Sequence, residues 1–440
     1  MGGVRTGRRP PPARYPFLLI STDALEFACT GLFFEFGVPG PATAYSRYVR
    51  KALCLLVFAI CECAMPTAVQ NLIVLGDSLS DIGNKREAPT GLFARALKAM
   101  RTNEIGRFSD GKNWTDFLIE WTGADTLVRA DKDTTESATL PHRSLTTRSM
   151  LLKTDTNANP PLFYANYAEG GAIAASDWKP KAGALGYLKD EVEAYLAARR
   201  ALGAHFRGHT LHIIWIGLND IVTAERGEGL VMGDREVYRV GRFESNKDGT
   251  GITPIIEEIK GLVDSIANAS GTRDQEHFLL IDLPSPTISI RFLDQIADGK
   301  REKVDKFEAN TVRFNDQLDY IATHWPARAD DAGPGANRDN ITLVRMNAWM
   351  KFVADNQEAF DLKGFAQQHG VPVRYPGQRD PVEPVFRRFL TTSDLAHPTE
   401  AVYQLIARKI AEDLLTKYTL GKLTPQTWPA LRPYPGVVPR

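Results

Sequence analysis

From residue 69 onward, short apolar runs alternate with amphipathic stretches along the chain. Four of the runs contain almost only apolar residues, and they span 72–75, 211–216, 278–281 and 341–344. Such continuous runs are typical of strands in a parallel sheet, because helices cover both faces of the sheet. Residues 69–418 are therefore expected to form a single α/β domain built on a mostly parallel sheet.

Four stretches between and after these runs repeat apolar residues three and four positions apart, which is the spacing of one helix face. The apolar positions are Leu185, Leu188, Val192 and Tyr195; Ile255, Ile256, Ile259, Leu262, Val263 and Ile266; Phe307, Phe314, Leu318 and Ile321; and Val402, Ile406, Ile410 and Leu414. We expect these faces to pack against the sheet.

Three other segments lack this periodicity. Residues 131–160 are rich in Thr, Asp and Asn, and residues 225–251 mix charged residues with glycines. Both are expected to be long loops, and such insertions often shape a substrate site. Residues 419–440 carry several prolines and are expected to form a tail beyond the domain.

Residues 1–68 are expected to form a leader, in which the segment 47–64 has the pattern of an export signal. Arg47, Arg50 and Lys51 precede an apolar run that is too short to cross a bilayer, which takes about 20 apolar residues. The sequence therefore predicts a secreted, periplasmic or extracellular protein. The segment lies unusually far from Met1, so either translation starts downstream or the leader is unusually long. The alternative is that the apolar run is a core strand or helix.

The composition argues against a nucleic-acid-binding protein and against a domain held by disulfides. The chain has 440 residues, and 53 Lys+Arg balance 53 Asp+Glu, so no bulk charge favours nucleic acid as a partner. The cysteines are Cys29, Cys54, Cys61 and Cys63, which all precede the domain and leave it no thiol for a disulfide framework.

A candidate nucleophile lies where the first predicted strand ends. Ser78 comes two residues after the strand, at the expected start of a helix that Asp77 and Asp81 would cap or brace. A serine hydroxyl is a poor nucleophile at neutral pH and needs a base and a group that orients the base. His397 is the candidate base, since an imidazole with an ordinary pKa of about 6.5 is competent near neutrality. Asp394 can reach its Nδ1–H through one local turn.

The same edge of the sheet offers donors for the negative oxygen that forms on attack. In open α/β sheets, ligands bind at the carboxyl ends of the strands, and Asn219 follows its strand much as Ser78 follows the first. The candidate donors are the N–H of Ser78, the N–H of Gly171 and the side-chain amide of Asn219. A glycine at position 171 allows close backbone approach.

Four segments, in this order, resemble the sequence blocks of the GDSL, or SGNH, hydrolases. They are 72–84 (LIVLGDSLSDIGN), 166–172 (NYAEGGA), 217–220 (GLND) and 394–398 (DLAHP), with 106–111 (GRFSDG) and 283–284 (LP) similar to secondary features of longer members. In this resemblance Ser78 is the nucleophile, Gly171 and Asn219 line the oxyanion hole, and Asp394 and His397 complete the triad.

The resemblance covers residues 71–416. It implies a three-layer α/β/α sandwich with a mostly parallel, flavodoxin-like sheet. It also implies ester hydrolysis without a metal or other cofactor, and frequently export. The two long segments without a match leave the identity of the substrate open.

Three functions are compatible with these residues. The first is an esterase or lipase that forms an acyl-enzyme on Ser78. Its substrate would be a small-molecule ester or a lipid ester, and a lipid substrate would involve transient contact with a membrane or lipid surface. An acyltransferase would use the same residues with an alcohol acceptor, and the sequence does not separate the two. A non-catalytic secreted binding module is disfavoured by the complete set of candidates. The sequence does not indicate the oligomeric state.

A second cluster of candidate ligands is formed by His205, His209 and His212. Two histidines four positions apart share a metal when they lie on one helix, but Gly203 and Gly208 interrupt helical structure here. No metal site is therefore expected.

Overall fold

The chain divides into two units, Met1–Met65 and Pro66–Arg440, and each described residue belongs to the second. The computed structural model describes residues 66–88, 102–103, 105–109, 111–123, 148–152, 162–175, 179–180, 186–203, 206–223, 230–231, 253–269, 273–325, 338–357, 359–360 and 396–431. The signal-like segment 47–64, the four cysteines and Asp394 lie outside the described residues.

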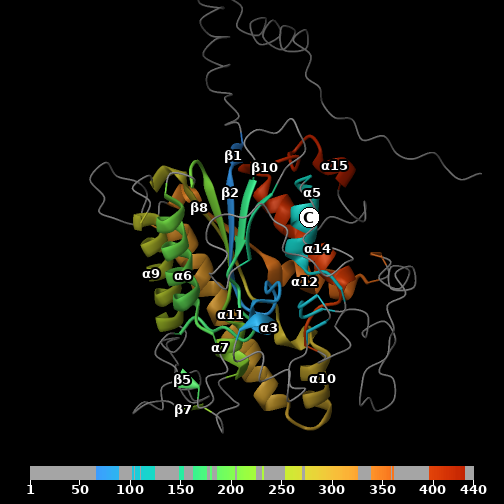
Figure 1. Cartoon of the computed structure of the whole chain (residues 1–440). Helices are drawn as coiled ribbons and strands as arrows, with labels where there is room; N and C mark the ends of the chain where they lie inside the picture. Colours follow the sequence, from blue (N-terminus) through green and yellow to red (C-terminus); the bar gives the residue numbers. More distant parts are fainter. Residues whose placement is uncertain are drawn as a thin grey trace, which may run out of the picture. The chain divides into compact units, whose positions relative to one another are not determined.

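A six-stranded sheet forms the centre of this unit (Figure 1). Its strands, in spatial order, are β3 (Arg148–Leu152), β4 (Leu162–Asn166), β2 (Asn71–Gly76), β6 (Thr210–Trp215), β8 (Glu276–Ile281) and β9 (Ile341–Val344). The last five are parallel, and their order is that of a flavodoxin-like sheet. The four predicted strands are confirmed, and strands β2, β6 and β8 are buried along their whole length.

In each of two strand pairings, one strand lies inside a segment expected to be a long loop, β3 in 131–160 and β7 in 225–251. Strand β3 pairs antiparallel with β4 at the edge of the sheet, and the two-residue strands β5 (Lys179–Pro180) and β7 (Leu230–Val231) pair with each other. The expectation of continuous loops was therefore wrong at these positions. An edge strand needs only one neighbour, so pairing with β4 can select a segment that lacks a long apolar run.

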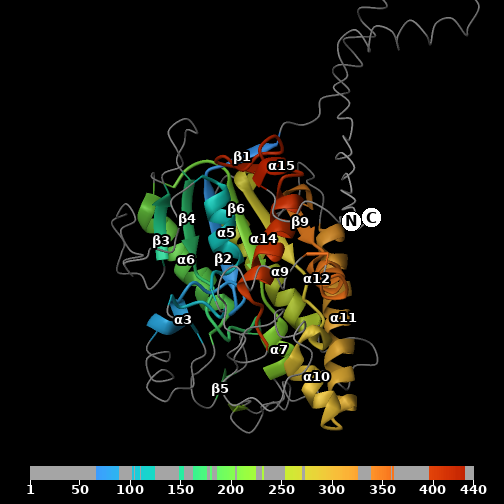
Figure 2. The same cartoon turned by 90° about the vertical axis from the view of Figure 1, so that its right-hand side faces the viewer.

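Helices cover both faces of the sheet, which confirms the three-layer α/β/α sandwich (Figures 1 and 2). One layer contains α6 (Leu188–Leu202), α9 (Thr253–Ala269) and α11 (Arg301–His324). The other contains α5 (Trp114–Trp121) and α14 (Glu400–Leu414), with α12 (Met346–Asp355) against α14. These include the four predicted helices, although Leu185 lies outside the described residues.

Shorter helices connect the layers at the strand ends. They are α3 (Asn84–Glu87), α7 (Leu218–Thr223), η4 (Arg273–Gln275), η5 (Pro286–Ile288), α10 (Ile290–Ala297), η6 (Arg338–Asn340) and α15 (Trp428–Leu431). None of the described helices combines the length and the apolar character needed to cross a lipid bilayer.

The folded unit extends beyond the boundary expected at residue 419. Strand β10 (Tyr418–Leu420) pairs in parallel with β1 (Thr67–Val69), and Leu420 and Leu423 are fully buried. Trp428 packs edge-on against Trp121 with ring centroids 5.2 Å apart. Apolar residues before and just after Pro425 thus anchor residues 419–431, a part of the expected Pro-rich tail that belongs to the folded unit.

This anchoring predicts that Leu420→Ala lowers the free energy of unfolding by about 2–5 kcal/mol, because it removes a buried side chain and leaves a cavity. Thr419→Ala is the matched control, since Thr419 lies in the same strand and is only partly buried. Urea unfolding of the two variants measures the difference. Equal stability of the two variants would contradict the assignment of β10 to the core.

Candidate active site

Strands β4, β2 and β6 lie side by side and end at the same edge of the sheet. The chain crosses from β2 to β4 on one side and later to β6 on the other, so the gap between β2 and β6 is the topological switch point where ligands bind in such sheets. Ser78 follows β2, Gly171 follows β4 and Asn219 follows β6. The three residues therefore lie in loops that leave neighbouring strands.

Ser78 and His397 meet at this edge although 319 positions separate them in the sequence. The distance from Ser78 Oγ to His397 Nε2 is 2.7 Å. Ser78 is 8% exposed, and His397 lies just before α14 and is partly buried. With Nε2 unprotonated, the Ser78 hydroxyl donates to it, which is the geometry of a general base beside a nucleophile.

The ring of Phe108 packs against the imidazole of His397, with centroids 5.0 Å apart. Its carbonyl oxygen accepts a hydrogen bond of 3.3 Å from the Tyr403 hydroxyl, which lies on α14. A side chain in place of Gly170 would collide with the Phe108 ring. Phe108 belongs to the segment 106–111, which the sequence marked only as a secondary feature, and the structure places it beside the candidate base.

Asn219 occupies the second position of α7 and links two of the loops. Its Nδ2 donates to the Ala172 carbonyl at 3.0 Å and to Asp77 Oδ2 at 3.4 Å. Asp77 also accepts the Leu79 N–H at 3.0 Å, and burial raises the pKa of Asp77 to about 6. The amide of Asn219 is thus held near Ser78 by neighbours on both sides.

Asp81 ties the loop that follows β2 to the loop that follows β4. Its carboxylate accepts the N–H groups of Gly83 and Asn84 at 2.6 Å and that of Gly170 at 2.8 Å. Burial raises the pKa of Asp81 to about 6. The helix α3 begins only at Asn84, and residues 78–80 form a turn, where the sequence had suggested a helix start at Ser78.

Asp220 ties the loop that follows β6 to the same region. Its two carboxylate oxygens accept the N–H groups of Ala174 and Ala175 at 2.9 and 3.0 Å. The residue is fully buried, and this burial raises its pKa to about 7. The sequence included Asp220 in a motif but did not indicate this role, because its partners lie more than forty positions away.

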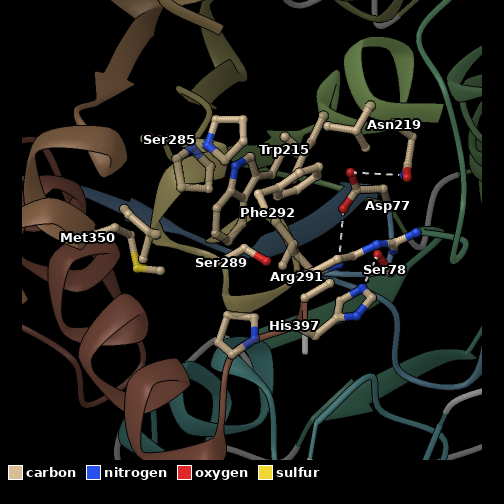
Figure 3. A pocket seen from close by; sticks show the side chains of 18 residues that line it. Asp77, Ser78, Trp215, Asn219, Ser285, Ser289, Arg291, Phe292, Met350 and His397 are labelled. Carbon is tan, nitrogen blue, oxygen red and sulfur yellow. Dashed lines mark hydrogen bonds between the residues drawn. The ribbon is translucent and has the colours of Figure 1, made fainter. Parts of the chain in front are cut away.

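Next to Ser78 and His397 lies a cavity of about 110 Å³ with mostly apolar walls (Figure 3). Trp215, Leu218 and Val222 form one side, and Phe292 and Met350 contribute others. The polar residues Ser285, Ser289 and Arg291 also line it. The sequence did not predict these walls. Their residues come from β6 and from the segments around α7, η5, α10 and α12, which meet only in the tertiary structure.

Two of the three histidines that suggested a metal site, His209 and His212, make hydrogen bonds to other residues of the sheet and α6. His212 is fully buried in β6, where Nδ1 donates to the His277 carbonyl and Nε2 accepts from the Tyr195 hydroxyl. Burial lowers the pKa of His212 to about 3, so the ring is neutral. His209 pairs with His277 at 2.8 Å, whereas His205 lies outside the described residues. No cluster of three or more metal-ligating side chains occurs among the described residues.

Comparison with known proteins gives one family match over most of the chain. The model of the GDSL-like lipase/acylhydrolase family matches residues 72–410, a range that contains Ser78, Gly171, Asn219 and His397. A curated relative, the thermolabile hemolysin of Vibrio parahaemolyticus, is 21% identical over 359 residues, which are 79% of this chain and 64% of the relative. The chain thus spans less than two thirds of the length of that relative.

One similar solved structure is that of a protein from Parabacteroides merdae assigned as a GDSL-like lipase. It has 12% sequence identity and a TM-score of 0.33, and the alignment covers 80% of this chain and 98% of that protein.

The contacts of Asp220 generate a prediction for Asp220→Asn. The asparagine presents an NH₂ group to one of the two backbone N–H groups, and an unsatisfied buried donor costs about 1–3 kcal/mol of stability. The pKa of Asp220 in the wild type rises from 3.8 to about 7 on folding. Between these pH values the native state therefore binds more protons than the unfolded state. The contribution of Asp220 to the free energy of unfolding of the wild type therefore falls as the pH rises across this window.

We expect the stability gap between wild type and Asp220→Asn to narrow from about pH 4 to pH 7 and to stay constant above. Urea unfolding at several pH values measures it. Asp316→Asn, an exposed substitution on α11, is the control and should show no such trend. A gap that is the same at every pH would contradict the described environment of Asp220.

Proposed function

Because the chain belongs to the GDSL-like lipase/acylhydrolase family, we propose that it is a carboxylic ester hydrolase with Ser78 as nucleophile and His397 as base. The observation that carries the proposal is the 2.7 Å contact between Ser78 Oγ and His397 Nε2. Two residues 319 positions apart meet at the switch point of the sheet, beside an apolar cavity. Family membership supports ester hydrolysis in general, and the contact supports this particular mechanism.

In the acylation step, Ser78 Oγ attacks the carbonyl carbon of the ester and its proton passes to His397 Nε2. The carbonyl oxygen becomes negative, and the N–H groups of Ser78 and Gly171 and the amide of Asn219 donate to it. Asn219 would exchange its long 3.4 Å contact with Asp77 for this oxygen. Neutral donors favour the charge that develops in the transition state without binding a free anion strongly.

The intermediate then collapses, the bond to the alcohol breaks, and His397 returns the proton to the leaving oxygen. Water then attacks the acyl-enzyme and gives a proton to His397; the bond to Ser78 Oγ breaks, His397 returns the proton to Oγ, and the acid is released. Asp394 is proposed to orient His397 through Nδ1–H. Phe108 supports the imidazole from the side of its ring.

We assign the apolar cavity to the acyl part of the substrate. Its walls offer few polar groups to a sugar or other hydrophilic acyl group. A buried apolar cavity of 150 Å³ holds benzene, so 110 Å³ accommodates about four carbon atoms. A short aliphatic acyl chain therefore fits best within the described walls.

The role of Ser78 is tested by Ser78→Ala. We expect loss of at least about a thousandfold in kcat on a nitrophenyl ester, with the melting temperature retained, since the residue supplies the nucleophile. A fluorophosphonate probe should label the wild type and Ser265→Ala, an exposed serine on α9, but not Ser78→Ala. Labelling of Ser78→Ala at the wild-type rate would contradict the proposed nucleophile.

The acyl cavity is tested by Val222→Phe, which narrows it from the α7 side. The wild type should gain kcat/KM from acetyl to butanoyl esters, because each buried CH₂ contributes about 0.8 kcal/mol. Val222→Phe should lose this gain while keeping most activity on the acetyl ester, and Val312→Phe, at an exposed site, should keep it. Kinetics on a chain-length series decides, and an equal effect of Val222→Phe on all chain lengths would contradict the assignment.

A further inference from the structure

Glu191 is a buried acid that neither the motifs nor the mechanism above uses. It lies in the first turn of α6 and is 6% exposed. Its side chain turns toward the carboxyl ends of β2 and β4. An acid in the first turn of a helix ordinarily faces solvent and interacts favourably with the helix dipole, as the neighbouring exposed Asp190 does. Burial of Glu191 therefore calls for a different role.

The two carboxylate oxygens of Glu191 accept one backbone N–H from each of two loops. Oε2 accepts the N–H of Gly76 at 2.8 Å, and Oε1 accepts the N–H of Glu169 at 3.2 Å. Gly76 is the last residue of β2 and lies two positions before Ser78. Glu169 follows β4 and lies two positions before Gly171. One carboxylate thus joins the two loops just before their proposed oxyanion donors.

The sheet does not supply an acceptor for the Gly76 N–H, because β2 and β4 separate at this point, and the Glu169 N–H donates to a backbone carbonyl as well as to Glu191. The paired register of the two strands ends at Val74 and Asn166, and the carbonyl of Gly76 accepts the Glu169 N–H at 3.0 Å as the last direct link. Position 76 requires glycine, because its φ is +147° and a Cβ atom would collide with the Trp215 carbonyl. Without Glu191, the Gly76 N–H would lose its acceptor in a buried position.

An acidic side chain suits this place because it only accepts hydrogen bonds when ionised. A glutamine would keep one oxygen but would turn an NH₂ group toward the second N–H. The acid is costly, since burial raises the pKa of Glu191 well above its usual range. Because one carboxyl group contacts both N–H groups, its size sets the spacing of the two loops.

We propose that Glu191 is a positioning residue that sets the separation of the Ser78 and Gly171 N–H groups around the oxyanion. This inference rests on the proposed function. Asp81 forms a second link between the same loops through the Gly170 N–H, so loss of Glu191 should shift the donors without unfolding the site. The consequence is a loss of transition-state stabilisation rather than of substrate binding.

The test compares Glu191→Gln with Glu193→Gln, the exposed acid on the same helix. The readouts are kcat and KM on a butanoyl ester and the inhibition constant of a trifluoromethyl ketone, which adds to Ser78 and forms an oxyanion. We expect Glu191→Gln to lower kcat by about 10- to 100-fold, as a misplacement of up to 1 Å does, with KM changed less than threefold. The inhibition constant should rise in parallel with the loss of kcat/KM, and Glu193→Gln should match the wild type.

The outcomes separate this inference from the proposed function. Absence of Ser78-dependent turnover in the wild type contradicts the proposed function. Turnover in the wild type, with kcat or the inhibition constant unchanged in Glu191→Gln, overturns the role of Glu191 alone. Should Glu191→Gln not fold, Glu191→Asp, which keeps the charge and shortens the reach, is judged by the same criteria.

Discussion

Buried carboxylates that accept backbone N–H groups hold the loops of this site in place. The loops leave neighbouring parallel strands where the ladder ends, and beyond that point buried N–H groups need other acceptors. Asp81 and Glu191 supply them between the β2 and β4 loops, and Asp220 supplies them for the segment after Gly171. Burial raises the pKa of all three acids, so each is costly in the fold. All three acids contact the loops that carry Ser78, Gly171 and Asn219.

The opposite side of the site depends on the layer formed by α5 and α14. His397 immediately precedes α14, whose inward face is fully buried against the sheet and α5. Phe108 comes from the segment before α5, and the Tyr403 hydroxyl of α14 bonds to its backbone. The position of the imidazole is therefore set by packing between two helices, together with its contact to Ser78.

A hydroxyl and an imidazole meet at this edge of the sheet beside a largely apolar cavity. Around Ser78 the described polar groups include the imidazole of His397, the amide of Asn219, the carboxyl group of Asp77 and the guanidinium of Arg291. Family membership indicates ester hydrolysis, while the cavity walls from α7, η5, α10 and α12 bear on the acyl group. These walls follow β6, β8 and β9, so one sheet edge provides both the reaction site and the pocket beside it.

The sequence alone predicted the parallel strands β2, β6, β8 and β9, the main helices and the residues at the strand ends. Apolar runs and helical periodicity are local patterns, and the spacing of short motifs is read directly from the chain. It did not predict β3, the anchoring of residues 419–431, the cavity walls, or the roles of Glu191, Asp220 and Phe108. Strand β3 depends on pairing with the nearby strand β4, and the others depend on partners far away in the chain, as when an acid on α6 meets the ends of β2 and β4. Local patterns carry no information about which buried N–H group needs an acceptor, and only the tertiary structure decides it.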